Sequence, residues 1–266
     1  MTDTIIGGRS SIKRSGQTVI RPAGPWTLTV HALLLHLRMS GFIQAPQPFD
    51  LRDDGTEVVS YLEGDVSNYP LSPAARSETA LHSAARMLRA YHDATKGFDG
   101  IKREDARWML PARLPAEVIC HGDFAPYNVV LQGETAVGLI DFDCAHPGPR
   151  VWDIAYALYR WSAFHHLETD GVFNLIGDQI ERAAQFCLSY GTDVLRDVSF
   201  AGLMLDRLDA MMAFMQAQAD AGNVTFQANI REGHLSVYQR DQSYIRTHAK
   251  RIDTALSAIL SGLHHP

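Results

Sequence analysis

Two polar side chains flank a predicted β-hairpin. Asn128 precedes a β-rich run at residues 129–131, Asp141 follows a second run at residues 136–140, and only the polar residues 132–135 separate the runs. This pattern predicts a hairpin. Because a hairpin returns the chain beside itself, we expect the Asn128 amide and the Asp141 carboxylate to lie close together. Hard oxygen ligands of this kind suit Mg²⁺, which takes few ligands from protein and the rest from phosphates and water.

Asp123 lies five residues before Asn128, on the loop that leads into the hairpin. A carboxylate at this place can accept the proton of a substrate hydroxyl as its oxygen attacks the γ-phosphate of a nucleotide. An isolated Asp or Asn in a loop is more often a turn or cap residue. The prediction of phosphoryl transfer therefore depends on Asp123, Asn128 and Asp141 occurring together, in this order around a hairpin.

The first 62 residues are predicted to form a small sheet with one helix. Short β-capable runs are expected at residues 10–13 and 17–21, the helix at residues 26–38 and a further strand at residues 57–62. Pro25 is expected at the first position of the helix, where its missing N–H has no intrahelical partner to lose.

The rest of the chain, residues 63–266, is predicted to be mostly helical. Helical periodicity covers about residues 75–92, 153–164, 173–190, 194–219 and 239–263. One non-helical island, residues 118–149, interrupts these helices and contains the hairpin. The catalytic chemistry is therefore expected on a short β segment within a helical lobe.

The motif His121-Gly122-Asp123-x-x-x-x-Asn128, followed by Ile140-Asp141-Phe142-Asp143, resembles the aminoglycoside phosphotransferase and choline kinase superfamily, whose members are relatives of protein kinases. The resemblance covers most of the chain and implies an α+β, two-lobed protein-kinase-like fold. Residues 1–62 would form the β-rich nucleotide-binding lobe, and residues 63–266 the helical lobe with the catalytic loop and substrate site. ATP, or GTP, would be the donor, Mg²⁺ the metal, and a small molecule with a hydroxyl group the acceptor.

The resemblance also implies roles for individual residues. Asp123 would be the catalytic base, and Asn128 and Asp141 the metal ligands. Asp143 stands where this superfamily varies and is a candidate to assist at the metal. The residues expected to brace the catalytic loop are His121 and Asp153.

Two features of related kinases are absent from this chain. A strand lysine normally reaches the α- and β-phosphates and a helix glutamate holds it, but here Arg21 ends the strand where the lysine is expected. Residues 27–48 contain no carboxylate, and Val30 or His31 stands near the expected place of the glutamate. Arginine is always charged and can bind two phosphate oxygens at once, so Arg21 is a candidate phosphate ligand. A solvated cation at a strand end is the alternative. The hinge to the nucleotide base is expected at Ser60, Tyr61 and Leu62.

Acidic residues are concentrated in the helical lobe. Residues 151–220 hold ten acidic residues against four arginines, and the whole chain has a formal net charge of −6. Asp206 and Asp209 would share one helix face because of their i,i+3 spacing. Such a cluster could attract a cationic acceptor such as an aminoglycoside or an amino alcohol. A solvated acidic surface would give the same pattern.

Composition excludes several classes of protein. Hydrophobic residues make up 46% and charged residues 20% of the chain, as in an ordinary globular enzyme. The negative charge argues against nucleic acids and anionic membranes as partners. The chain lacks a signal-peptide pattern and an apolar run long enough to span a membrane. The three cysteines show no disulfide or metal spacing, so we expect a cytoplasmic protein with reduced thiols.

Two other hypotheses remain beside an active kinase. The chain could be a kinase-like nucleotide-binding module with weak phosphoryl transfer, which the missing lysine and glutamate would favour. It could also be a metal-dependent hydrolase that uses His121, Asp123, Asp141, Asp143 and His146, a ligand set that favours transition metals and needs no nucleotide.

Overall fold

The computed structural model describes residues 2–7, 10–99, 105–165, 173, 175–195 and 198–262. The chain divides into two compact units, Met1–Asp153 and Ile154–Pro266. The division falls within α4 (Arg150–Trp161). The predicted boundary between lobes at residue 62 lies inside the first unit and stays a prediction.

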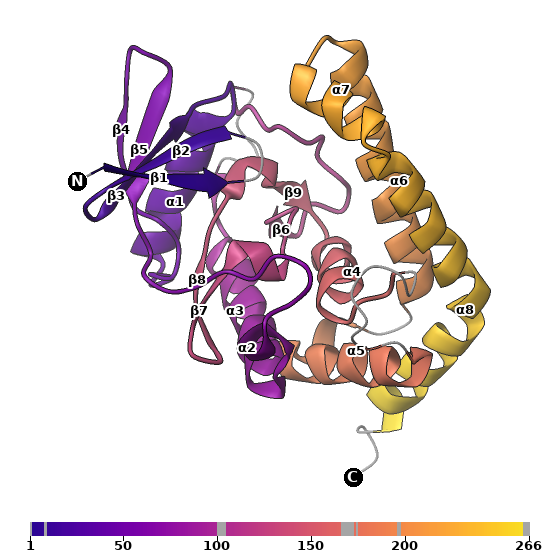
Figure 1. The fold of residues 1–266 in the computed structure, drawn as a ribbon. Coiled ribbons are helices and arrows are strands. Elements are labelled where there is room, and N and C mark those ends of the chain that lie inside the picture. Colours follow the sequence, from indigo (N-terminus) through magenta and orange to yellow (C-terminus); the bar gives the residue numbers. More distant parts are fainter. Residues whose placement is uncertain are drawn as a thin grey trace. The chain divides into compact units, whose positions relative to one another are not determined.

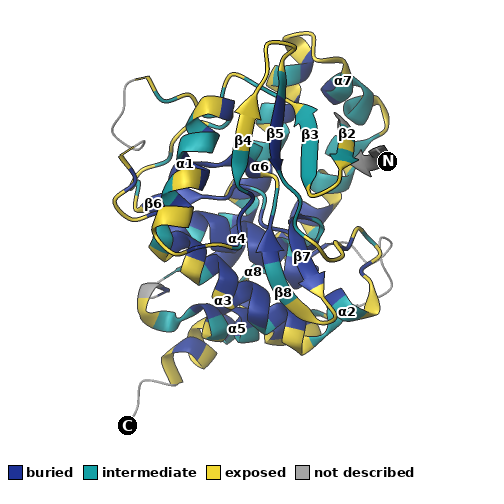
Figure 2. Cartoon of the chain, turned by 90° about the vertical axis from the view of Figure 1, so that its left-hand side faces the viewer, coloured by how far each residue is buried: buried dark blue, intermediate teal, exposed yellow. Residues whose placement is uncertain are grey.

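A five-stranded antiparallel sheet begins the first unit (Figure 1). Its strands, in spatial order, are β1 (Thr2–Gly7), β2 (Ser10–Ser15), β3 (Thr18–Pro22), β5 (Thr56–Ser60) and β4 (Pro48–Leu51). Gly16 has φ +60° in the turn between β2 and β3, a conformation that glycine adopts without steric cost, and the predicted hairpin is confirmed. β1 and β4 were not predicted. β4 is an exposed edge strand while β5 beside it is buried (Figure 2), so β4 has little apolar pattern to reveal it.

The predicted helix of the first unit is confirmed as α1 (Thr27–Met39). Its apolar residues repeat at helical spacing and are buried on one face: Val30, Leu33, Leu34 and Leu37. The expected place of Pro25 is wrong by two residues. The Thr27 N–H donates to the Gly24 carbonyl over 3.0 Å, so Pro25 lies in a turn before the helix.

The long helix expected at residues 75–92 is broken into α2 (Pro73–Arg76) and α3 (Glu78–Ala94). Ser77 causes the break because its backbone is extended and its hydroxyl accepts the Ala80 N–H, as an N-cap does. Apolar periodicity continues across both helices, so the sequence alone could not show the interruption.

The non-helical island is confirmed and contains two small sheets. β6 (Val118–Cys120) pairs with β9 (His146–Gly148), and β7 (Val129–Gln132) pairs with β8 (Thr135–Leu139) as the predicted hairpin. Single 3₁₀ turns, η2 (Pro126–Asn128) and η3 (Phe142–Cys144), stand at the two open ends of this hairpin. Asn128 is thus the last residue before β7, and Asp141 lies between β8 and η3.

The second unit is helical in its described residues. Its helices are the C-terminal part of α4, then α5 (Ile176–Tyr190), α6 (Phe200–Asp220), α7 (Val224–Arg231) and α8 (His234–Gly262), with a 3₁₀ turn η4 (Thr192–Val194). α8 packs along α6 and α5. α7 was not predicted, and α8 begins five residues earlier than expected. Parts of the predicted helices, at residues 174, 196–197 and 263, lie outside the described residues.

None of the helices in the described part of the chain combines the length and the apolar character needed to cross a bilayer.

Candidate active site

The hairpin brings Asn128 and Asp141 to the same place. Val129 pairs with Leu139, and the Ile140 N–H donates to the Asn128 carbonyl over 2.9 Å. The backbones of Asn128 and Asp141 therefore lie side by side, as the hairpin prediction required. Neighbouring strands lie only about 5 Å apart, so both side chains start from adjacent backbone positions.

Asp123 is held by two donors. Tyr127 Oη donates to its Oδ1 over 2.7 Å, and Asn128 Nδ2 donates to its Oδ2 over 2.9 Å. The same Nδ2 also donates to the Asp123 carbonyl over 2.9 Å. Because the Asn128 nitrogen faces Asp123, its Oδ1 is directed elsewhere and can serve as a cation ligand. Tyr127 was not among the predicted site residues.

Asp141 has a left-handed backbone conformation, with φ 63° and ψ 68°. A non-glycine residue in this region costs about 1 kcal/mol or more, and such strain is concentrated at functional sites. The Asp141 side chain is half exposed, so its carboxylate can reach a ligand from solvent.

Arg21 binds three carboxylates at once. Its Nε donates to Glu57 over 2.8 Å, Nη1 to Asp141 over 2.9 Å and Nη2 to Asp143 over 2.7 Å. Burial disfavours the charged guanidinium, but Asp143, Asp141 and Glu57 together outweigh burial and raise the pKa of Arg21. The alternative interpretation of Arg21 as a solvated strand-end cation is wrong, because its side chain is only 15% exposed.

Asp143 contacts the Arg21 guanidinium at Nη2, the nitrogen next to the one that contacts Asp141. Burial raises the pKa of Asp143 to about 6; Arg21 opposes this shift, and the charge of Asp141 adds to it. Three carboxylates around one arginine leave the site with excess negative charge. A divalent cation would offset this charge.

Asp153 anchors the loop that carries Asp123. Its Oδ2 accepts the His121 N–H over 2.6 Å and a hydrogen bond from His92 Nε2 over 3.0 Å, while its Oδ1 accepts the Gly122 N–H over 2.9 Å. Burial opposes ionisation of this carboxylate, but the bonds from His92 and His121 outweigh it and lower the pKa of Asp153 to about 2. Gly122 has φ +80°, and a Cβ there would lie 2.2 Å from the Cys144 carbonyl oxygen.

The imidazole of His121 is buried and uses both nitrogens. Its Nε2 donates to the Ile140 carbonyl over 3.0 Å, and its Nδ1 accepts the Asp123 N–H over 3.3 Å. The ring thus links the loop of Asp123 to the end of β8. Neither nitrogen is left for a metal in this arrangement.

The predicted hinge begins at Ser60, the last residue of β5, and continues through Tyr61 and Leu62. The Tyr61 N–H donates to the Gln17 carbonyl over 2.9 Å, so it is already used within the sheet. The Leu62 side chain packs on Gly138 of β8: a Cβ added to Gly138 would lie 2.8 Å from Leu62 Cδ1. Ser60 Oγ accepts the Gln47 N–H over 2.8 Å. The three residues thus connect the sheet to the hairpin.

Glu57 escaped the sequence analysis, whereas His31 was named there only as standing near the expected place of the helix glutamate. Glu57 is buried at 2% side-chain exposure and is the cross-strand partner of Arg21, and His31 of α1 bonds to it over 2.6 Å. A lone carboxylate in the apolar strand Thr56–Ser60 was the signal that could have revealed Glu57, because charged residues are rarely buried unless paired.

The donor set fits Mg²⁺ better than a transition metal. Asp141 and Asp143 would supply carboxylate oxygens and Asn128 an amide oxygen, which are the hard ligands that Mg²⁺ prefers, and the two carboxylates share the Arg21 guanidinium. Within the described ranges, no group of three or more His, Cys, Asp or Glu side chains could hold a metal ion. The ligand set required by the hydrolase hypothesis is therefore not assembled there.

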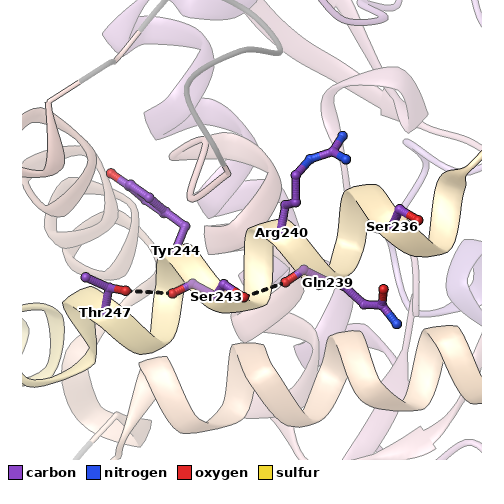
Figure 3. A pocket seen from close by; sticks show the side chains of 6 residues that line it. All are labelled: Ser236, Gln239, Arg240, Ser243, Tyr244 and Thr247. Atoms are coloured by element: carbon purple, nitrogen blue, oxygen red, sulfur yellow. Dashed lines mark hydrogen bonds between the residues drawn. The ribbon is translucent and has the colours of Figure 1, made fainter.

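A separate polar pocket lies on α8, away in sequence from every predicted site residue (Figure 3). Two of its hydroxyls bond within the helix, Ser243 to the Gln239 carbonyl over 3.0 Å and Thr247 to the Ser243 carbonyl over 2.9 Å. Tyr244 Oη donates to Gln179 over 2.8 Å. The residues lining the pocket are Ser236, Gln239, Arg240, Ser243, Tyr244 and Thr247.

Known proteins are similar to this chain in sequence and in fold. Residues 102–175 match the phosphotransferase enzyme family. The Trifolitoxin immunity protein of Rhizobium leguminosarum bv. trifolii is 38% identical over 161 residues, which are 58% of this chain and 59% of that protein. The chain thus spans about three fifths of the length of this curated relative.

Two solved structures are similar over nearly the whole chain. A choline/ethanolamine kinase family protein from Mesorhizobium loti superposes with a TM-score of 0.60 at 14% identity, covering 97% of this chain and 92% of that one. The amicoumacin kinase hAmiN, solved with AMP-PNP, Ca²⁺ and its antibiotic, gives 0.59 at 11% identity, covering 87% and 88%. The predicted resemblance to the aminoglycoside phosphotransferase and choline kinase superfamily is confirmed: residues 102–175 match the phosphotransferase enzyme family, and the chain shares the kinase-like fold of these solved structures.

Proposed function

We propose that this protein transfers the γ-phosphate of ATP, or GTP, to a hydroxyl group of a small molecule such as an aminoglycoside, an amino alcohol or a sugar. The observation that carries the proposal is the pairing of Asp123 with Asn128 at the entrance of the hairpin whose exit is Asp141. One loop thus holds a proton acceptor beside a set of oxygen ligands.

In this proposal Asp123 orients the acceptor hydroxyl and takes its proton. The acceptor oxygen forms a bond to the γ-phosphorus while the bond from that phosphorus to the bridging oxygen of the diphosphate breaks. ADP, or GDP, then leaves, and the proton stays on Asp123 until it passes to solvent. Most of the rate enhancement comes from alignment and charge neutralisation.

The metal would be held by Asn128 and Asp141, with Asp143 assisting. Bound Mg²⁺ would supply positive charge against the phosphate oxygens. The described donor oxygens and the excess negative charge around Arg21 support this assignment. His121 and Asp153 would keep the loop in place through the hydrogen bonds that join them to the chain around Asp123.

Arg21 and the hinge residues Ser60, Tyr61 and Leu62 would bind the nucleotide. Arg21 can direct two N–H groups at phosphate oxygens once the metal-site carboxylates have turned to the cation. Because the Tyr61 N–H is already used, hydrogen bonds to the base would come from other backbone groups of the hinge.

A cationic acceptor is favoured by the exposed carboxylates of α6. Asp206 and Asp209 are both exposed on that helix, and Asp209 accepts a bond from Gln242 over 2.7 Å. Three further acidic residues of this segment, Glu168, Asp170 and Asp197, lie outside the described residues. The similarity to a choline/ethanolamine kinase family protein supports an amino alcohol, and that to an amicoumacin kinase supports an antibiotic.

The proposal is tested by incubating the purified protein with Mg²⁺ and ATP or GTP. Aminoglycosides, amino alcohols, sugars and other antibiotics serve as acceptors, because one relative is named an immunity protein. Phosphorus NMR should detect a new phosphomonoester and the nucleoside diphosphate in equal amounts. In parallel, Mg²⁺–ATP at a hundredfold excess over Kd should stabilise the protein by about 2.7 kcal/mol, and a chelator should remove most of the effect. The absence of a thermal shift with both nucleotides at millimolar concentration would contradict the proposal.

A further inference from the structure

Arg21 and Glu57 form a direct cross-strand pair. The two residues are register partners in the antiparallel ladder of β3 and β5, and Arg21 Nε lies 2.8 Å from Glu57 Oε1. The side chains are 15% and 2% exposed, respectively. Cross-strand partners on one face start close together, so the sheet itself holds this pair in register.

The second carboxylate oxygen of Glu57 is bound from the helix. His31 Nε2 lies 2.6 Å from Glu57 Oε2, and the His31 side chain is 13% exposed. Both oxygens of a buried carboxylate are thus occupied, one by the strand arginine and one by α1. The helix contributes a hydrogen-bond donor here, and the carboxylate comes from the neighbouring strand.

The three nitrogen groups of Arg21 are divided between two kinds of partner. Nη1 and Nη2 contact Asp141 and Asp143 at the candidate metal site, whereas Nε contacts Glu57. A cation bound by Asp141 and Asp143 would leave Nη1 and Nη2 available for phosphate oxygens, while Nε would stay on Glu57. Without Glu57, the guanidinium would keep only the metal-site carboxylates and would compete with the cation for them.

We propose that Glu57, oriented by His31, is the positioning residue that keeps Arg21 directed at the nucleotide phosphates when the metal binds. The pair of Glu57 and His31 fills the role of the helix carboxylate that related kinases use. The inference rests on the proposed function, because it assigns Glu57 a part in binding the same nucleotide.

The test is a double-mutant cycle on ATP binding, measured by calorimetry at low and high Mg²⁺ concentration. Glu57→Gln keeps the size of the side chain and removes its charge, so Kd should rise about tenfold at low Mg²⁺, the usual worth of one charge-assisted hydrogen bond. The difference should shrink at high Mg²⁺, because excess metal displaces the guanidinium from its carboxylates. In the Arg21→Ala background, Glu57→Gln should change Kd less than about twofold, since the group that it positions is gone.

Asp50→Asn is the matched control. Asp50 is an exposed carboxylate on β4 of the same sheet and lies 3.6 Å from Arg52. Its substitution makes the same chemical change without touching Arg21, so Kd should equal that of the wild type. Thermal unfolding without nucleotide checks that each variant is folded.

His31 provides a second route if Glu57→Gln does not fold. His31→Ala should raise Kd severalfold, and His31→Gln, whose amide nitrogen can donate to the same carboxylate oxygen, should recover most of the loss. If Glu57→Gln and His31→Ala both bind ATP as tightly as the wild type, the positioning role is wrong, while the proposed function stands. The same holds if Glu57→Gln changes Kd equally in the presence and in the absence of Arg21. A folded wild type that binds neither ATP nor GTP would overturn the proposed function and this inference with it.

Discussion

Asn128 Nδ2 donates to Asp123 Oδ2 over 2.9 Å, so the candidate metal ligand and the candidate base are joined by one hydrogen bond. The bond fixes the amide of Asn128 with its oxygen turned away from Asp123. It also holds the Asp123 carboxylate in a set orientation. Substitutions at Asp123 and Asp141 should therefore separate the proton acceptor from the metal site.

Asp123→Asn should lower turnover by about 10²–10⁴-fold, the usual worth of general base catalysis, and leave the Mg²⁺–ATP thermal shift nearly unchanged. The new amide can accept from Asn128 and donate to Tyr127, so the loop keeps its hydrogen bonds. Asp141→Asn should lose the thermal shift and the turnover together, because it weakens a metal ligand. Steady-state rates and melting curves with and without Mg²⁺–ATP measure both. Turnover of Asp123→Asn at the wild-type rate would refute the role of Asp123.

Arg21→Ala should weaken nucleotide binding, because a charge-assisted contact to phosphate is lost. Arg21→Lys should restore only part of the affinity, since a single ammonium cannot engage Glu57, Asp141 and Asp143 as the planar guanidinium does. Calorimetric titration with ATP and Mg²⁺ gives the two dissociation constants. An alanine variant that binds as tightly as the wild type would leave Arg21 without a role in binding, and Lys13 or Arg14 would be examined next.

Gly122→Ala should destabilise the fold by about 2 kcal/mol or more, because its φ of +80° is strained for alanine and the new Cβ would meet the Cys144 carbonyl. Gly133→Ala is the matched control: Gly133 has φ +59°, and a Cβ there would have no atom within 4 Å, so only the backbone cost of about 1 kcal/mol applies. Urea unfolding of both variants measures the difference. Equal stabilities would show that the loop can move away from Cys144.

The contribution of His92 to stability should fall as the pH decreases below about 6.5, while Asp143, whose pKa is raised to about 6, contributes in the opposite direction between about pH 6 and 4. Burial lowers the pKa of His92 from its usual 6.5 despite the hydrogen bond to Asp153, so below that pH the unfolded chain binds a proton that the folded chain does not. Asp153, with a pKa of about 2 in the folded state, adds a second loss below about pH 4 that is complete only near pH 2. Urea unfolding of the wild type and of His92→Gln between pH 8 and 5 isolates the His92 step, because the opposing contribution of Asp143 is the same in both proteins. An unchanged slope in that variant would assign the titration to another group.

The sequence alone determined the hairpin and the order of Asp123, Asn128 and Asp141 around it. These features are local: the turn between β7 and β8 dictates that Asn128 and Asp141 meet, and Asp123 precedes them by a few residues. The helix α1 was equally readable, because its apolar residues follow the helical period. Local rules failed at α2 and α3, where one serine hydroxyl interrupts a continuous apolar pattern.

Only the tertiary structure decided what surrounds Arg21. Its partners lie 36, 120 and 122 residues away in sequence, and they meet because β5 pairs with β3 and the hairpin end lies beside that sheet. No periodicity within a window of the chain encodes such pairings. Residues 27–48 contain no carboxylate, and the carboxylate that contacts Arg21 Nε comes instead from Glu57 on β5, which His31 of α1 contacts in turn. The physical reason is that charge compensation depends on distance in space, whereas motifs record only distance along the chain.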